Sequence, residues 1–346
     1  RTGRGDRGLF GTVGSRATIR NVGIVDASVT GGSDNLNNRI GCLIGHLTGG
    51  TISSCYVSNS TATAGIDAQI GGLVGRQAGG TIRACYVSNS TATGGGERVR
   101  VGGLVGDQAG GGITACYVVS NSKAKGENNS EVGGLVGNQG SAGTIRACYV
   151  ANSTATGTTN SNVASLVGRA QGGGTITACY VSNSTATGGE SAKLGGLAGL
   201  MQGGSTIRAC YVSNSTATGG RNAGIGSLVG SNQFKTMIVA SYAGGMNYNK
   251  LIGLPASGTV TNSYYQRATV SDTNNADKTR LPKTASALQT PTGYTGIYAD
   301  WDDLDGDGTT DAELFWDFGS TSQYPVLKID FNGDDSTTDD VMRQRN

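Results

Sequence analysis

The sequence has little of several residue types, and each shortage excludes a class of protein. Only 14% of its 346 residues are charged, and the 26 basic residues are nearly balanced by 24 acidic ones. The sequence therefore has no basic stripe for binding nucleic acid. No run of about 18 apolar residues occurs, so we expect no membrane-spanning helix. One histidine, His46, and no Cys-x-x-Cys pair leave little material for a catalytic triad or a zinc site.

Proline is also scarce, whereas glycine is abundant. The chain has four prolines and 60 glycines, but no Gly-X-Y period, which excludes collagen. Its apolar residues are regularly spaced, which argues against disorder. The chain starts at Arg1 with neither a methionine nor a signal peptide, so we expect a processed or excised piece of a longer protein.

Two landmarks recur with a period near 31 residues. The first, Cys-Tyr-Val followed by Asn-Ser, has its cysteines at Cys55, Cys85, Cys116, Cys148, Cys179 and Cys210. The second, Gly-Gly-Leu-Val-Gly or a close variant, ends at Gly45, Gly75, Gly106, Gly137, Gly168, Gly199 and Gly230. In most copies a Thr-Ile pair separates the second landmark from the next first one. A fixed period of this length is the signature of a repeat architecture.

The composition of each copy predicts strands rather than helices. Copies are rich in β-branched residues, are broken by Gly-Gly, and lack a helical period of sufficient length. We therefore predict an all-β fold, a parallel β-solenoid of about nine coils, with equivalent strands ~4.8 Å apart along its axis. The solenoid is expected to occupy residues 1–265, and residues 266–346 to form a C-terminal cap or linker region.

Replacements between copies predict which rows face inward. The cysteine position holds only small residues, Val22 in the first copy and Ser241 and Ser263 in the last ones, which fits an interior row. The alanine of Thr-Ala-Thr is also expected inside. Its threonine neighbours are replaced once by Lys123 and Lys125, so the threonine rows should face solvent.

Gly-Gly-Leu-Val-Gly, followed by Gly-Gly-Thr-Ile and Cys-Tyr-Val, resembles the GLUG-motif repeat over residues 8 to about 265. The tail also resembles segments that close such arrays, through Leu288-Gln-Thr-Pro-Thr and Trp316-Asp-Phe-Gly. The resemblance implies an exported, β-rich scaffold of large bacterial secreted and surface proteins, including adhesin-like proteins and regions attached to IgA-cleaving peptidases. It brings no catalytic residue, because the motif contains none.

The cysteine row has two interpretations. Neighbouring coils place Cα atoms at a distance that disulfides accept, so Cys55–Cys85, Cys116–Cys148 and Cys179–Cys210 are possible pairs. Parallel side chains in a ladder do not point at each other, however, and Val22 and Ser241 continue the row without sulfur. We favour stacked, buried thiols that act as small hydrophobic groups.

A tyrosine row follows the cysteine row and is the main candidate for contact with a ligand or partner. It comprises Tyr56, Tyr86, Tyr117, Tyr149, Tyr180, Tyr211, Tyr242 and Tyr264. These residues alternate with inward-facing ones, so we expect them to face outward. Exposed rings would form a stripe for sugars or for subunit contact. The alternative is that stacked rings stabilise the ladder or lie under the tail.

The acidic tail is the candidate metal site. Asp303, Asp305 and Asp307 fit the opening of a calcium loop, and Asp311 occupies its ninth place. The twelfth place is Leu314 instead of a bidentate acid, so the loop is not a complete EF-hand. A weaker candidate comprises Asp330, Asn332 and Asp334. The alternative for both segments is a solvated acidic turn.

These features predict a non-catalytic, extracellular structural or adhesive element at the bacterial cell surface. We expect it to be part of a larger surface protein or a fibre subunit that contacts protein partners, or itself, through the solenoid ends. The alternative is a glycan-binding module that contacts cell-surface glycans. Glycan processing is less favoured, because no coil departs from the repeat toward clustered carboxylates. Ice binding by the threonine rows is also less favoured, because Lys123 and Lys125 interrupt them.

Overall fold

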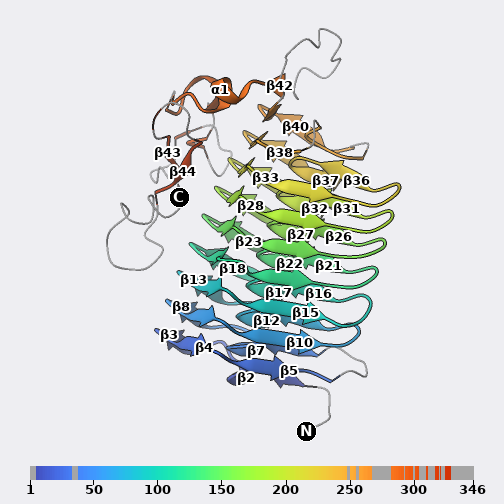
Figure 1. Cartoon of the computed structure of the whole chain (residues 1–346). Coiled ribbons are helices and arrows are strands. Elements are labelled where there is room, and N and C mark those ends of the chain that lie inside the picture. The colour runs from blue at the N-terminus through green and yellow to red at the C-terminus, as the bar shows by residue number, and fades with distance from the viewer. Residues whose placement is uncertain are drawn as a thin grey trace.

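The computed structural model describes most of the repeat region and parts of the tail. The described residues are 5–32, 38–247, 250–254, 257–266, 282–291, 293–298, 301–303, 309–310, 316–318, 320 and 324–328. The repeat region is a stack of coils made of short strands, and the stack forms a rod with the coil of residues 5–32 at one end (Figure 1). Every strand of the rod pairs in parallel with its equivalent in the next coil, and this confirms the predicted β-solenoid.

One coil contains five short strands, each contributing to a different sheet. In the coil that begins near residue 67 these are β11 (Gln69–Gly71), β12 (Val74–Gln77), β13 (Thr81–Arg83), β14 (Tyr86–Ser88) and β15 (Thr91–Gly94). We call the five parallel sheets A to E in this order. Strands of three or four residues are sufficient because each one is hydrogen-bonded to the coils before and after it.

The bounds of the other strands in sheets A and B follow from the same register. Sheet A contains β1 (Asp6–Arg7), β6 (Arg39–Gly41), β16 (Arg100–Gly102), β21 (Glu131–Gly133), β26 (Asn162–Ala164), β31 (Lys193–Gly195) and β36 (Gly224–Gly226). Sheet B contains β2 (Phe10–Val13), β7 (Ile44–Leu47), β17 (Val105–Gln108), β22 (Val136–Gln139), β27 (Val167–Ala170), β32 (Ala198–Met201) and β37 (Val229–Asn232).

Sheets C, D and E complete the coils. Sheet C contains β3 (Thr18–Arg20), β8 (Thr51–Ser53), β18 (Gly111–Thr114), β23 (Gly143–Arg146), β28 (Thr175–Thr177), β33 (Thr206–Arg208), β38 (Met237–Val239) and β40 (Thr259–Thr261). Sheet D contains β4 (Gly23–Val25), β9 (Tyr56–Ser58), β19 (Tyr117–Val119), β24 (Tyr149–Ala151), β29 (Tyr180–Ser182), β34 (Tyr211–Ser213), β39 (Tyr242–Gly244), β41 (Tyr264–Gln266) and β42 (Pro282–Lys283). Sheet E contains β5 (Ser28–Thr30), β10 (Thr61–Ala64), β20 (Lys123–Lys125), β25 (Thr154–Thr156), β30 (Thr185–Thr187) and β35 (Thr216–Thr218).

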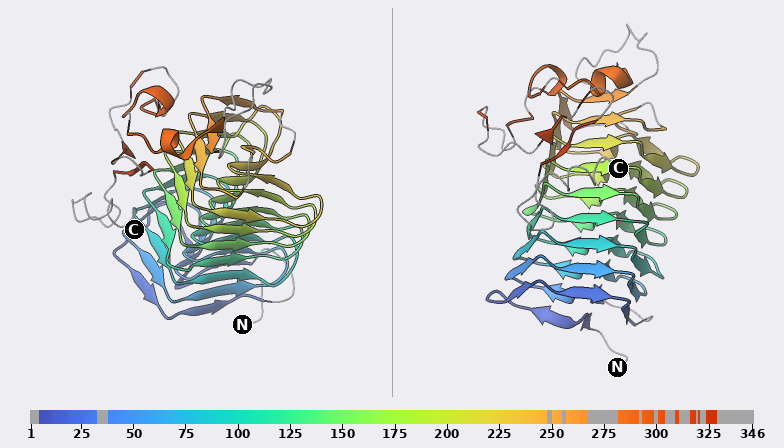
Figure 2. Two further views of the ribbon diagram at one scale, coloured as in Figure 1. Left: turned by 45° about the horizontal axis from the view of Figure 1, so that its top comes forward. Right: turned by 60° about the vertical axis from the view of Figure 1, so that its left-hand side comes forward.

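The rod has about eight turns, slightly fewer than the predicted nine. Sheets A and B each have 8 strands, whereas sheet C has a ninth in β40. Beyond the solenoid, the described tail includes α1 (Ala285–Leu288), the 3-10 turn η1 (Gly296–Tyr298), and an antiparallel pair, β43 (Trp316–Asp317) with β44 (Val326–Leu327). These elements lie at the C-terminal end of the rod and along one side of it (Figure 2).

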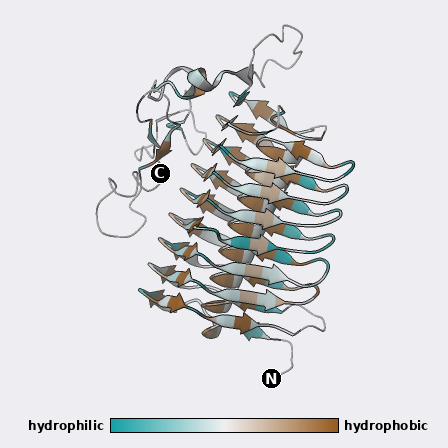
Figure 3. Ribbon diagram, viewed as in Figure 1, coloured by the Kyte–Doolittle hydropathy of each residue, from teal (hydrophilic) through white to brown (hydrophobic). Residues whose placement is uncertain are grey.

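Apolar residues recur at the same place in successive coils (Figure 3), and their side chains form one buried core along the rod. The leucine of the second landmark is fully buried in every copy, at Leu43, Leu73, Leu104, Leu135, Leu166, Leu197 and Leu228. The alanines of Thr-Ala-Thr are also buried, from Ala62 to Ala217, whereas Lys123 and Lys125 beside them are exposed. The predicted inward and outward rows of this segment are therefore confirmed.

The final glycine of the second landmark is required by a close approach of two backbones. A Cβ atom on Gly137 would lie 2.5 Å from the carbonyl oxygen of Gly106 and 2.6 Å from the backbone nitrogen of Val101. Gly137 belongs to sheet B, while Val101 belongs to sheet A of the preceding coil. Only a residue without a side chain allows sheets A and B to meet this closely.

Two corners of each coil use the same device, a left-handed residue followed by a small hydroxyl or thiol. Asn89 has a φ of 47°, and the hydroxyl of Ser90 donates to the carbonyl of Ser88 at 2.7 Å while accepting from the backbone N–H of Ser60 at 3.0 Å. At the other corner, the Cys85 thiol contacts the carbonyl of Arg83 at 3.2 Å and accepts from the N–H of Cys55 at 3.4 Å. The recurring Asn-Ser pair and the recurring cysteine therefore supply hydrogen-bond partners to the backbone N–H and C=O groups at the two corners.

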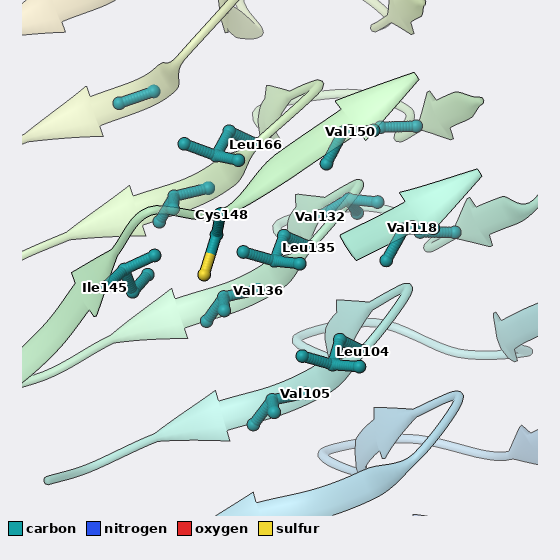
Figure 4. Close-up of a cluster of buried hydrophobic side chains, with 14 of the residues drawn as sticks. Leu104, Val105, Val118, Val132, Leu135, Val136, Ile145, Cys148, Val150 and Leu166 are labelled. Carbon is teal, nitrogen blue, oxygen red and sulfur yellow. The ribbon is translucent and has the colours of Figure 1, made fainter. Parts of the chain in front are cut away.

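The cysteines are free and buried, which confirms the interpretation as stacked thiols over the disulfide alternative. Figure 4 shows the sulfur of Cys148 inside the core beside Val136 and Ile145. Ser241 replaces cysteine in the row and makes the same contacts, accepting from the N–H of Cys210 at 3.2 Å. Serine can do so because its hydroxyl fills the same place with the same bonding pattern.

We expect the native protein to resist thiol reagents. Burial raises the pKa of Cys42 to about 11, and burial also raises the pKa of Cys148 and Cys210. The reactive thiolate form of these three cysteines is therefore scarce at neutral pH, and burial denies the reagent access to all seven thiols. Labelling with Ellman's reagent should give less than about one fast-reacting thiol in buffer. In denaturant it should detect all 7 cysteines. Rapid reaction of several thiols in the native protein would contradict a closed core.

Candidate functional site

The tyrosine row forms a continuous ladder of stacked rings. Ring centroids of successive residues from Tyr56 to Tyr242 lie 4.9 to 5.2 Å apart, and the rings are tilted by no more than 10°. The spacing equals that of the strands, because each ring stands on the ring one coil away. The rings belong to a cluster separate from the solenoid core, so they point outward as predicted.

The C-terminal half of this ladder is covered by the tail. Tyr180, Tyr211 and Tyr242 are at most 1% exposed, and Tyr117 and Tyr149 are also buried. The covering side chains are Leu288, Tyr298, Trp301, Trp316 and Leu327. The expectation of an exposed stripe is therefore wrong for Tyr117 to Tyr242. These rings instead fit the alternative of a stacked ladder beneath the tail, and only Tyr56, Tyr86 and Tyr264 remain half-buried.

Aromatic contacts and a few polar bonds fix the tail on the ladder. The ring of Trp316 lies 5.5 Å from that of Tyr211 and 4.7 Å from that of Trp301. The Tyr298 hydroxyl donates to the carbonyl of Leu288. Burial raises the pKa of Tyr242 and of Tyr298 above the usual value, because the tail removes both phenols from water.

Asp303, the first residue of the predicted calcium loop, forms an ion pair with the rod. Its carboxylate lies 2.7 Å from the guanidinium of Arg208, and Arg208 Nε also donates to the Asp303 carbonyl. Asp305, Asp307 and Asp311 lie outside the described residues, as do Asp330, Asn332 and Asp334. The part of the chain that the structure describes contains no group of three or more acidic, cysteine or histidine side chains able to hold a metal. Calcium binding therefore stays a prediction.

A second outward-facing feature, which the sequence did not reveal, lies where sheets A and B meet. We call it the polar seam. Sheet A contributes Arg39, Gln69, Arg100, Glu131, Asn162 and Lys193, one from each of six successive coils. Sheet B contributes His46, Arg76, Asp107, Asn138 and Arg169. These residues alternate with core residues along their strands, so they lie on the outside of the rod.

Ion pairs in the polar seam link neighbouring coils and the two sheets. Arg100 contacts Asp107 at 3.3 Å in its own coil and Glu131 at 3.1 Å in the next one. Arg169 contacts the other oxygen of Glu131 at 2.7 Å. Asp107 also faces Arg76 at 3.4 Å, so each buried carboxylate is shared between two guanidinium groups. Opposite charges thereby replace the like charges that a strict repeat would stack.

His46 belongs to the N-terminal part of the polar seam. Arg39 Nη1 lies 3.0 Å from His46 Nδ1 and 3.3 Å from Asp6. Because a guanidinium only donates, Nδ1 acts as the acceptor and the ring proton lies on Nε2. Burial and the nearby Arg39 lower the pKa of His46, so the ring is neutral at pH 7. Contacts with one carboxylate, Asp6, and one arginine, Arg39, orient the ring.

The coil built from β11 to β15 is the part of the chain that matches a known family model. Residues 67–94, which span this coil, match the family model described as the GLUG motif. In this coil the motif's leucine, Leu73, is the fully buried core residue, and its last glycine, Gly75, is the point where sheets A and B touch.

Other comparisons concern the fold. Among solved structures, the chain is similar to the crystal structure of a "putative immunoglobulin A1 protease" from Bacteroides ovatus. The identity is 17%, the TM-score is 0.47, and the match covers 94% of this chain and 87% of that one. A search of curated proteins gives no significant match.

The GLUG motif accounts for the core and the corners but not for the outward side chains. Arg76, for example, follows the last glycine of the motif and is replaced by Asp107 and Asn138 in the next coils. The variable outward positions are therefore where copies of one GLUG coil acquire different surfaces. In the described residues, no helix is both long enough and apolar enough to span a bilayer.

Proposed function

We propose that the chain is a non-catalytic, extracellular structural or adhesive element of a bacterial surface protein. Support comes from the core, in which leucine, cysteine and alanine rows are buried and the cysteine thiols bond to backbone within the rod. These side chains hold successive coils together. Resemblance to GLUG arrays supports the location. Contacts with partners are then made by outward rows and by the ends of the rod.

The single observation that carries this proposal is a difference between the two ends. In the first coil, the inward-facing Ile19, Ile24 and Val29 are only partly buried, and Val25 is 50% exposed. In the last coils the corresponding Val260 and Tyr265 are 4% and 9% exposed. The N-terminal end of the described rod therefore presents apolar residues and strand edges that pair on one side only.

The partner that fits this end is one more β-coil of the same type. Such a coil would bury the first-coil residues and pair with the free edges of β1 to β5. A head-to-tail fibre also needs an open C-terminal end, which the burial of Val260 and Tyr265 does not support. The additional coil is then supplied either by adjoining polypeptide or by the N-terminal end of a second copy.

Two measurements test this proposal and separate the two sources. A second copy should give a dimer in sedimentation velocity that dissociates when Phe10, 39% exposed at the open end, is changed to lysine. Adjoining polypeptide should leave a monomer whose melting temperature rises when a duplicate of residues 67–97 is fused ahead of residue 5. Phe234→Lys, at an apolar site near the other end that is 70% exposed, is the control. A monomer that gains no stability from the added coil would refute end docking.

A further inference from the structure

The tail covers only part of the tyrosine ladder, and the coils toward the N-terminal end of the rod keep some of their outward side chains accessible. Tyr56 and Tyr86 are half-buried, whereas Tyr211 and Tyr242 are at most 1% exposed. Beside these rings, Arg83 in sheet C is exposed. In Figure 1, α1, β43 and β44 lie next to the C-terminal coils, while β8 and β13 lie toward the other end. We call Tyr56, Tyr86 and Arg83 the uncovered ladder end.

An arginine row runs along sheet C beside the tyrosine ladder, with one arginine in every second coil. It comprises Arg20, Arg83, Arg146 and Arg208, and the coils between them have Ser53, Thr114 and Thr177 at the same position. Tyr86 follows Arg83 by three residues, just as Tyr211 follows Arg208. The strand register therefore makes these two Arg–Tyr pairs equivalent, four coils or ~19 Å apart along the rod.

The tail shows which chemistry an Arg–Tyr pair of this kind binds. The Asp303 carboxylate lies 2.7 Å from the Arg208 guanidinium, and each side chain is only 13% exposed. The Trp316 ring lies 5.5 Å from that of Tyr211 at an interplanar angle of 52°. Ladder rings stack on one another and leave their edges outward, so an incoming ring meets them at an angle. One segment thus fills both positions with a carboxylate and an aromatic ring.

We propose that the uncovered ladder end binds an acidic, aromatic segment of a partner polypeptide, with a carboxylate on Arg83 and an aromatic ring on Tyr86. Among the described residues, no carboxylate pairs with Arg83. The partner binds through side chains rather than as an added strand, because β13 and β14 are each paired on both sides. The guanidinium selects an acidic segment over a basic one. This inference rests on the proposed function, since it names the partner of one outward row.

The test measures binding of a dye-labelled peptide to the whole chain by fluorescence anisotropy. The peptide has the sequence of residues 294–328, which includes Asp303 and Trp316. It should bind saturably, with one peptide per chain. Arg83→Gln in the protein should weaken binding about fivefold or more, because it removes a hydrogen-bonded ion pair. Arg221→Gln, which removes an exposed arginine from the turn between sheets E and A, should leave binding unchanged.

A double-mutant cycle identifies the contact. The Asp303→Asn peptide should bind the parent chain as weakly as the parent peptide binds Arg83→Gln, and the two changes together should cause no further loss. The site is overturned by absence of saturable binding, by additive losses, or by full binding to Arg83→Gln, which would indicate exchange with the docked tail. Thermal unfolding checks that the variants fold. Phe10→Lys should bind the peptide normally, so failure of this site and failure of end docking give different results.

Discussion

Replacing Gly137 with alanine is expected to destabilise the rod strongly. The new Cβ atom would lie within 3 Å of the backbone at Gly106 and Val101, and no side-chain rotation can relieve a contact with backbone. Sheets A and B would have to separate through several coils, because each strand is bonded to the next. We expect a loss of about 3 kcal/mol or more in the free energy of unfolding, measured by urea denaturation.

A matched control exists one coil earlier. Gly112 occupies a position that is Thr81 and Thr144 in the neighbouring coils, and a Cβ atom there would meet only the Thr144 hydroxyl at 3.4 Å. Gly112→Thr should therefore change stability by less than about 0.5 kcal/mol, or raise it by restricting the unfolded chain. Similar losses of unfolding free energy for both variants would mean that close backbone contact does not explain the requirement for glycine at position 137.

Replacing Trp316 with alanine is expected to release the tail from the tyrosine ladder. The indole is 1% exposed and contacts Tyr211 and Trp301, and loss of a buried tryptophan ring costs about 3–5 kcal/mol. The solenoid should persist, because its core contains none of the tail residues. Limited proteolysis should then cut the tail away and leave a folded rod, whereas the parent protein should resist.

The tyrosines report the same event spectroscopically. In the docked state, the raised pKa of Tyr242 and Tyr298 keeps both phenols neutral above pH 10. Their contribution to docking is therefore complete below about pH 10 and is lost as the pH rises further, because the released phenols ionise first. Trp316→Ala should shift the ultraviolet titration of tyrosine to lower pH. Trp316→Phe, which keeps a ring on Tyr211, should shift it less. An unchanged titration would contradict burial of the ladder by the tail.

The sequence was sufficient to predict the stacking, because each structural position of a solenoid recurs in every repeat of the sequence. The cysteine row was readable as an interior one, since every replacement in it, such as Ser241, is small. Lys123 and Lys125 likewise marked the exposed face of sheet E. Each of these inferences depends on comparing equivalent letters, and the structure places those letters directly above one another.

The tail and the polar seam were not predictable in this way. The tail is not repeated, so nothing in its letters shows that Trp316 rests on Tyr211, more than 100 residues earlier. The seam was missed because its positions vary, and varying positions were interpreted as unspecific surface. A signal was present, since Arg100 has an opposite charge both seven residues later, at Asp107, and one period later, at Glu131.

The central claim, that equivalent letters of successive repeats are stacked along one axis, is tested most directly by distances between spin labels. Cysteines introduced at Thr61, Thr185 and Thr216 lie on outward-facing positions of sheet E, of which Thr185 is half-buried, and the native thiols are buried. Thr61 and Thr185 are four coils apart and Thr216 is one coil further, so the two Cα distances from Thr61 should be ~19 and ~24 Å. The account is contradicted if the two distances from Thr61 are equal, or if the distance to Thr216 exceeds the distance to Thr185 by an amount far from ~4.8 Å.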